Sequence, residues 1–163
     1  MKDIKVPSFL TDHTTLKAGL YLREEKRLNL FTKLKVWDLR FVAPMDKLPI
    51  SSGALHVIEH MFAFRLRECL TSRYVSCFVY GCRTGLGLIT KSNVTEEDLA
   101  SCIMWVIDQL CPISSVDEVP AMNETQCGSP FLYDIKGAND ALISYYKTLL
   151  DLGHKSACYD FVD

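Results

Sequence analysis

The chain has 163 residues, of which 48% are hydrophobic and 23% are charged, and its formal net charge is −2. This length fits one domain, which we place at residues 1–163, and the composition is ordinary for a water-soluble globular protein. Because lysine and arginine form no basic stripe along the sequence, we expect no nucleic-acid partner.

The apolar segments of the sequence are too short for export or membrane insertion. The first ten residues hold no apolar core of signal-peptide length, and the longest apolar run, residues 102–107, cannot cross a bilayer. We therefore expect a cytoplasmic protein with no membrane partner. The seven cysteines include no Cys-x-x-Cys pair, so free thiols are the expected state.

The first predicted elements are a turn and an irregular strand. Residues 23–27 mix positive and negative charges, which predicts a solvated turn. Residues 28–42 are rich in β-formers, but their alternation changes phase near Trp37, which indicates a bulge or a strand that enters a new environment. The change places Asp38 and Arg40 on a face that is apolar upstream, so both need a partner or a polar ligand.

Residues 51–70 are predicted to form a helix, with Ser51 or Ser52 as its cap. Its apolar residues recur at helical spacing: Leu55, Ile58, Phe62, Leu66 and Cys69. Residues 74–80 are a continuous β-prone run, which predicts a strand covered on both faces. A tight turn at residues 81–85 and a return strand at residues 86–90 follow.

The last predicted elements are two further helices. Thr95 and Asp98 have the spacing of a capping box, and the helix after them directs four apolar residues inward: Leu99, Ile103, Val106 and Leu110. Residues 112–120 are predicted to be irregular, and residues 138–150 form the final helix. Strands and helices without strict alternation predict an α+β domain, with an antiparallel or mixed sheet packed against helices.

The strongest chemical signal is the segment from His56 to His60. Residues four apart share one helix face, so both imidazoles can bind one metal ion, with Glu59 beside them. The order His-x-x-Glu-His is known from inverted zinc peptidases. The alternative is a surface helix with two histidines and a carboxylate, although two of the chain's four histidines fall in this one segment.

Two cysteines extend this hypothesis. Because a catalytic metal usually has three protein ligands and one open position, Cys127 is the candidate third ligand, on a turn that Gly128 permits. A buried small hydrophobe is the alternative for this residue. Cys82 precedes Arg83 in the predicted turn, where a nearby cation would lower the pKa of its thiol and make it reactive. The alternative is a turn cysteine without a role.

Five segments together resemble S-ribosylhomocysteine lyase, the LuxS family of autoinducer synthesis. They occur in the family's order and spacing: Ser8-Phe9 with Asp12-His13-Thr14, residues 37–41, residues 56–60, residues 81–85, and Asn123-Glu124 with Gln126-Cys127-Gly128. Without this resemblance, the N-terminal cluster of Ser8, Asp12 and His13 would be interpreted as the start of a helix or turn.

The resemblance implies a role for each candidate residue and a state of assembly. His56, His60 and Cys127 would hold one divalent metal ion per subunit, ferrous iron in the cell, with zinc or cobalt as substitutes. Glu59 and Cys82 would be the acid and base, and substrate would be bound by three residues: Ser8, His13 and Arg40. The family is a homodimer with its active sites at the subunit interface.

The resemblance also implies the reaction. S-ribosyl-L-homocysteine would be cleaved to L-homocysteine and 4,5-dihydroxy-2,3-pentanedione, the precursor of autoinducer-2. The sugar carbonyl would first migrate from the first to the third carbon, and β-elimination would then break the carbon–sulfur bond. A divalent ion stabilises the enediolates of such migrations as a Lewis acid, and positioned acid and base residues move the protons.

The chain departs from the family at a few positions, which keeps two alternatives open. Val79 and Tyr80 replace a usual Pro-Met pair, Ser76 replaces an aspartate of many members, and Tyr133 replaces a frequent histidine. One alternative is a metallopeptidase built on the same His-x-x-Glu-His segment. The other is a metal-binding family member with impaired catalysis, since resemblance in fold does not guarantee activity.

Overall fold

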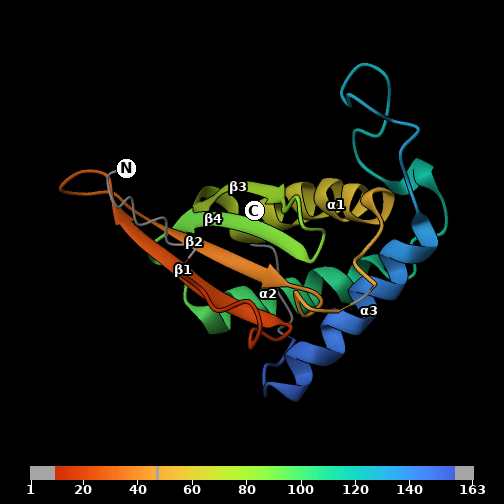
Figure 1. Ribbon diagram of the computed structural model, residues 1–163. Helices are drawn as coiled ribbons and strands as arrows, with labels where there is room; N and C mark the ends of the chain where they lie inside the picture. The colour runs from red at the N-terminus through yellow and green to blue at the C-terminus, as the bar shows by residue number, and fades with distance from the viewer. Residues whose placement is uncertain (1–9, 47, 157–163) are drawn as a thin grey trace, which may run out of the picture.

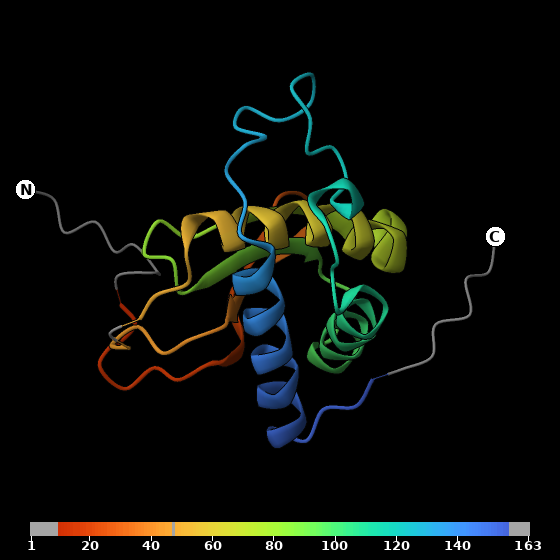
Figure 2. The ribbon, with the colours of Figure 1, turned by 90° about the vertical axis from the view of Figure 1, so that its right-hand side faces the viewer.

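A four-stranded antiparallel sheet with helices on one face forms the part of the chain that the computed structural model describes, residues 10–46 and 48–156 (Figures 1 and 2). The strands run in the order β1-β2-β4-β3 and comprise β1 Gly19–Arg27, β2 Lys33–Arg40, β3 Tyr74–Val79 and β4 Gly85–Lys91. The helices are α1 Ser52–Leu70, α2 Glu96–Leu110 and α3 Ile135–Asp151, with short 3-10 turns η2 Thr71–Arg73 and η3 Val116–Glu118. The predicted α+β class is therefore confirmed. No helix of residues 10–46 and 48–156 combines the length and the apolar character that a membrane span requires.

The first hairpin corrects the sequence-based prediction. Residues 23–27 are not a turn but the outer half of β1 at the sheet edge, where Glu25, Lys26 and Arg27 are exposed and Arg23 and Glu24 are half-buried. The turn lies at residues 28–32, so β2 starts only at Lys33. The bulge lies in β1, between Leu22 and Glu24, opposite the phase change of β2. The last four residues of β2 are all buried, as expected of a strand that enters a new environment.

Strand β3 also differs from its prediction as a strand covered on both faces. It is the other edge of the sheet, because among the described strands only β4 pairs with it. Its side chains at Val75, Phe78 and Val79 are exposed. A continuous apolar run therefore marks an edge strand here, and several of its side chains are exposed.

The helices follow the predicted caps and faces. Ser51 caps α1 by accepting a hydrogen bond from the amide of Ala54, and Thr95 with Asp98 forms the capping box of α2. The apolar residues predicted to point inward on both helices are buried in one core. Cys69 of α1 and Cys102 of α2 form a disulfide across this core, whereas free thiols were expected.

The first residues of α3 attach the segment between α2 and α3 to the start of α1. Asp134 caps α3 by accepting from the amide of Gly137, and it also accepts from the hydroxyl of Ser51 at 2.6 Å. A Cβ atom on Gly53 would lie 2.8 Å from the backbone of Tyr133, so a side chain there would push the two segments apart. The long segment between α2 and α3 (Figure 1) is thus attached to the first turn of α1.

Strands β2 and β4 approach each other most closely at Gly85. A Cβ atom at this position would lie 2.2 Å from the carbonyl oxygen of Leu39, so only glycine fits. The carbonyl of the preceding residue, Thr84, accepts from the amides of Phe41 and Val42. This close approach places the side chain of Thr84 beside Arg40.

We expect Gly85→Ala to lower the free energy of unfolding by about 1–3 kcal/mol, because the added methyl group overpacks the contact between the strands. Urea denaturation of both proteins measures the difference. Gly81→Ala is the matched control, since a Cβ atom there meets no atom within 4 Å. Equal losses of stability in the two variants would contradict the packing argument.

Candidate metal and catalytic site

Helix α1 presents His56 and His60 on one face, with their ring centroids 4.7 Å apart. Nδ1 of His56 lies 2.7 Å from the carbonyl oxygen of Leu132, and Nδ1 of His60 lies 2.8 Å from that of Pro120. Because a carbonyl only accepts hydrogen bonds, both Nδ1 atoms carry the proton. Both Nε2 atoms therefore keep a lone pair for a metal ion, as in metal-binding histidines whose other ring nitrogen donates to a backbone carbonyl.

Cys127 joins the two histidines from the segment between α2 and α3. Its Sγ atom lies 3.3 Å from Nε2 of His56, and the ligand atoms of His56, His60 and Cys127 all lie within 4.8 Å of one another. The loop is shaped by Asn123, whose carbonyl accepts from the amide of Cys127 at 2.9 Å. The Ser129 amide donates to the same sulfur at 3.4 Å.

The chemistry of these donors fits a divalent transition metal. Two neutral imidazoles and one thiolate form a three-ligand set, which leaves a fourth tetrahedral position for a substrate or water. This combination suits iron, zinc and cobalt alike. The structure thus brings together the three residues that the sequence suggested as ligands.

Glu59 lies between two cavities beside these residues. A cavity of about 300 Å³ has walls from α1 and from the turn after β3, including His56, Tyr80 and Arg83. A second cavity of about 480 Å³ runs along α1. Glu59 is in the wall of both, so one carboxylate can reach molecules in either cavity.

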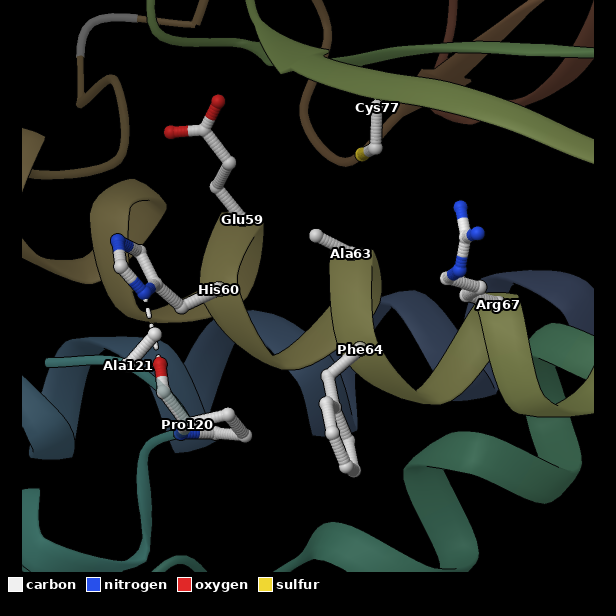
Figure 3. A pocket seen from close by; sticks show the side chains of 8 residues that line it. All are labelled: Glu59, His60, Ala63, Phe64, Arg67, Cys77, Pro120 and Ala121. Carbon is white, nitrogen blue, oxygen red and sulfur yellow. Dashed lines mark hydrogen bonds between the residues drawn. The ribbon is translucent and has the colours of Figure 1, made fainter. Parts of the chain in front are cut away.

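The larger cavity is mainly apolar, with charged groups at its two ends. Figure 3 shows Glu59 and His60 at one end and the guanidinium of Arg67 at the other, with Phe64 between them on the same helix. Cys77 of β3 faces the helix from the opposite wall. This shape can hold an extended polar molecule that has an apolar middle part.

Cys82 lies in the turn between β3 and β4, as predicted, and its thiol has a lowered pKa. Burial acts to raise the pKa, but hydrogen bonds from the hydroxyl and amide of Thr84, and then from Arg40, outweigh it. The Sγ atom lies 3.0 Å from Oγ1 of Thr84 and 3.8 Å from Nη1 of Arg40. These contacts favour the thiolate form of Cys82 over the neutral thiol.

Asp38 and Arg40 are paired through one carboxylate oxygen and the terminal guanidinium nitrogens, whereas Oδ1 of Asp38 and Nε of Arg40 are buried without a hydrogen-bond partner among the described residues. Nη2 of Arg40 donates to Oδ2 of Asp38 at 2.7 Å, and Arg23 of β1 donates to the same oxygen through two nitrogens. The guanidinium of Arg40 also lies over the ring of Tyr80, 5.0 Å from its centroid. The sequence analysis missed Arg23, because it placed that residue in a solvated turn.

The N-terminal substrate-binding candidates are only partly within the described residues. Ser8 lies outside them. His13 is exposed, and its Nδ1 is 2.8 Å from the carbonyl of Thr11. The hydroxyl of Thr11 accepts from Arg23 at 3.3 Å. The segment that carries His13 is thus connected to the residues behind Cys82, although His13 is not in the wall of either cavity described above.

Comparison with known proteins gives one consistent result. The family model described as "S-Ribosylhomocysteinase (LuxS)" matches residues 6–155. The S-ribosylhomocysteine lyase of Bifidobacterium longum subsp. infantis is 36% identical over 126 residues, which are 76% of this chain and 75% of that protein. The lyase of Borrelia garinii subsp. bavariensis is 33% identical over 77% and 79% of the two chains. That of Borreliella burgdorferi is 28% identical over 95% and 98%.

We expect Cys127→Ala to lose bound metal, because two imidazoles alone hold an ion far more weakly than three ligands. Loss of a supporting hydrogen bond already weakens metal binding by roughly 10–100-fold, and loss of a ligand costs more. Elemental analysis of the purified variant measures the effect. Cys111→Ala, which removes a free thiol outside the cluster, is the control. A full equivalent of metal in Cys127→Ala would remove Cys127 from the ligand set.

Proposed function

We propose, from the premise that this chain belongs to the S-ribosylhomocysteinase (LuxS) family, that it cleaves S-ribosyl-L-homocysteine in a metal-dependent reaction. The resemblance of the five sequence segments to this family is confirmed, and the chain is a carbon–sulfur lyase. The products would be L-homocysteine and 4,5-dihydroxy-2,3-pentanedione. The observation that carries the proposal is the cluster of His56, His60 and Cys127 beside the carboxylate of Glu59.

The chemistry of the substrate explains why such a site is needed. An unactivated thioether does not break at neutral pH, so the sugar carbonyl must first move next to the carbon whose proton is to be removed. The two products together contain all the atoms of the substrate. No co-reactant is consumed, and the protein has only to move protons between carbon and oxygen atoms and to stabilise negative charge.

His56, His60 and Cys127 would hold one divalent ion, and we propose ferrous iron, with zinc or cobalt as substitutes. When bound, the ion supplies Lewis acidity to oxygen atoms of the sugar. The two carbonyl contacts of the histidines keep Nε2 directed at the ion. The thiolate of Cys127 offsets part of the positive charge of the ion.

Cys82 and Glu59 would carry the proton transfers. A thiolate at Cys82 takes a proton from a sugar carbon and returns it to the neighbouring carbon, which completes one carbonyl migration. Glu59, in the wall of both cavities, exchanges protons with the sugar oxygens and with the departing sulfur. Positioned acids and bases of this kind each contribute roughly 10²–10⁴-fold to the rate.

The remaining parts of the proposal concern substrate binding and assembly. We propose that Ser8, His13 and Arg40 bind polar groups of the substrate. We further propose a homodimer whose active sites lie at the subunit interface, so that the N-terminal segment of one subunit completes the site of its partner. We also propose a cytoplasmic location, where the exposed thiol of Cys82 would stay reduced.

One assay tests the proposed activity against the alternatives. Anaerobically purified, iron-loaded protein is incubated with S-ribosyl-L-homocysteine, and the released thiol is titrated. Release of homocysteine supports the lyase, cleavage of casein supports a metallopeptidase, and inactivity in both assays supports a metal-binding family member with impaired catalysis.

We expect Cys82→Ala to keep about one equivalent of metal and to lose about 10²–10⁴-fold in turnover, because Cys82 transfers protons and does not bind the ion. Homocysteine release and elemental analysis measure the two properties on one preparation. Cys111→Ala, which also removes a free thiol, should retain both. Turnover of Cys82→Ala near the wild-type rate would contradict the proposed role of Cys82.

We expect His13→Ala and Cys82→Ala subunits, each inactive alone, to regain activity when mixed and allowed to exchange. In a heterodimer with composite sites, one site carries both defects and the other carries neither. A fully randomised mixture should therefore reach about a quarter of wild-type activity. Subunit exchange is verified separately by mass spectrometry of differently tagged chains. No recovery after verified exchange would mean that each site is built within one chain.

A further inference from the structure

The side chain of Thr84, in the turn before β4, connects Cys82 of the same turn with Arg40 of β2. Its Oγ1 atom is within hydrogen-bonding distance of Nη1 of Arg40 and lies 3.0 Å from Sγ of Cys82. A guanidinium can only donate hydrogen bonds, so the hydroxyl oxygen of Thr84 accepts from Arg40. The hydroxyl hydrogen is then free to point at the sulfur. This direction of donation favours a sulfur that accepts, which is a thiolate.

A second feature is the balance of buried charge behind the turn. Asp38 is almost fully buried, and its Oδ2 atom receives hydrogen bonds from Arg40 and from Arg23. Two guanidiniums and one carboxylate leave one net positive charge, and Arg40 directs it at Cys82. A thiolate at Cys82 compensates that charge, whereas a neutral thiol would leave it uncompensated in a partly buried place.

The other ionisable groups near the turn do not provide this compensation. Burial raises the pKa of Tyr80 to about 12, with the nearby charge of Asp38 as a further cause, so the phenol is neutral near pH 7. Arg83, in the same turn, is a second cation and is exposed. Glu59 of α1 faces the turn across the smaller cavity. The negative charge of Glu59 disfavours a thiolate at Cys82, so the positive charge of Arg40 must outweigh it.

We propose that Thr84 is a further catalytic residue, which donates a hydrogen bond to the sulfur of Cys82 and holds it as the thiolate. We also infer that Asp38 and Arg23 are positioning residues, which keep Arg40 directed at Thr84 and Cys82. That this thiolate acts as a base rests on the proposed function. The contacts that hold the thiolate do not depend on the substrate.

The test compares Thr84→Val, which removes the hydroxyl from a side chain of similar shape, with Thr84→Ser, which keeps it. Thr90→Val is the matched control: Thr90, on β4, is buried like Thr84, accepts from the indole of Trp37 and makes no contact with Cys82 among the described residues. Metal-loaded proteins are alkylated with iodoacetamide at a series of pH values. Peptide mass spectrometry gives the labelling rate of Cys82 at each pH.

We expect the labelling midpoint of Cys82 in Thr84→Val to rise by about one pH unit, a tenfold change in the thiol–thiolate equilibrium. Thr84→Ser and Thr90→Val should keep the wild-type midpoint. Cys77 is an internal reference, because burial, followed by the charge of Glu59, raises the pKa of its thiol to about 12. It should stay unlabelled near neutral pH in every variant.

Arg23→Gln gives a second measurement at a partly exposed position, and it decides the question if Thr84→Val does not fold. Its labelling midpoint should also rise, because Asp38 loses two donors and the cluster loses a positive charge. A midpoint in Thr84→Val equal to that of Thr90→Val, or an unchanged midpoint in Arg23→Gln when only that variant folds, would overturn the inference.

Alkylation requires no substrate, so this inference and the proposed function can fail separately. A raised midpoint in Thr84→Val, with no homocysteine released by the wild type, would leave the thiolate assignment standing and remove the lyase proposal. Normal homocysteine release with an unchanged midpoint would do the reverse.

Discussion

The hydrogen bond between Ser51 and Asp134 joins the two places where α1 and α3 begin, and the site depends on it. The segment between α2 and α3 is long and lies away from the sheet (Figure 2). It supplies Cys127 of the candidate metal site and both carbonyls that orient the histidines. Such a segment can place a thiolate within bonding reach of α1 only if its end is fixed, and this shared cap fixes it.

The opposite wall of the site is organised by buried charge. The β2 strand carries an aspartate and an arginine into the interior, where isolated charges would be costly. Each is stabilised by the other, and Arg23 of the neighbouring strand supplies the second cation. The absence of a side chain at Gly85 lets the strands approach closely enough for Thr84 to take part. Packing and electrostatics therefore act on the same few atoms.

Much of this arrangement could be predicted from the sequence, because it rests on local spacing. The caps at Ser51 and Thr95, the inward faces of α1 and α2, and the pairing of His56 with His60 all follow from helical periodicity. The need of Asp38 for a partner could be predicted because its side chain falls on a strand face that is apolar upstream.

The rest depends on contacts between residues that lie far apart along the chain. Arg40 and Thr84 are separated by 44 residues, and no local pattern indicates their hydrogen bond. The β1 strand was missed because most of its outer half is exposed, so its run of charges resembles a turn. The β3 strand was misassigned because an apolar run does not show which side of it is covered. The disulfide between Cys69 and Cys102 joins two helices whose register no sequence spacing reveals.

The hydrogen bond from Arg23 to Thr11 has a thermodynamic consequence. The same guanidinium contacts the N-terminal segment on one side and Asp38 on the other, so the two places are energetically coupled. Coupling free energy is reciprocal. Whatever stabilises the position of Thr11 also stabilises the arrangement of Asp38 and Arg40, and a change at Asp38 and Arg40 affects Thr11 by the same free energy. A molecule that contacts Thr11 and holds it in place would thereby also favour the thiolate form of Cys82.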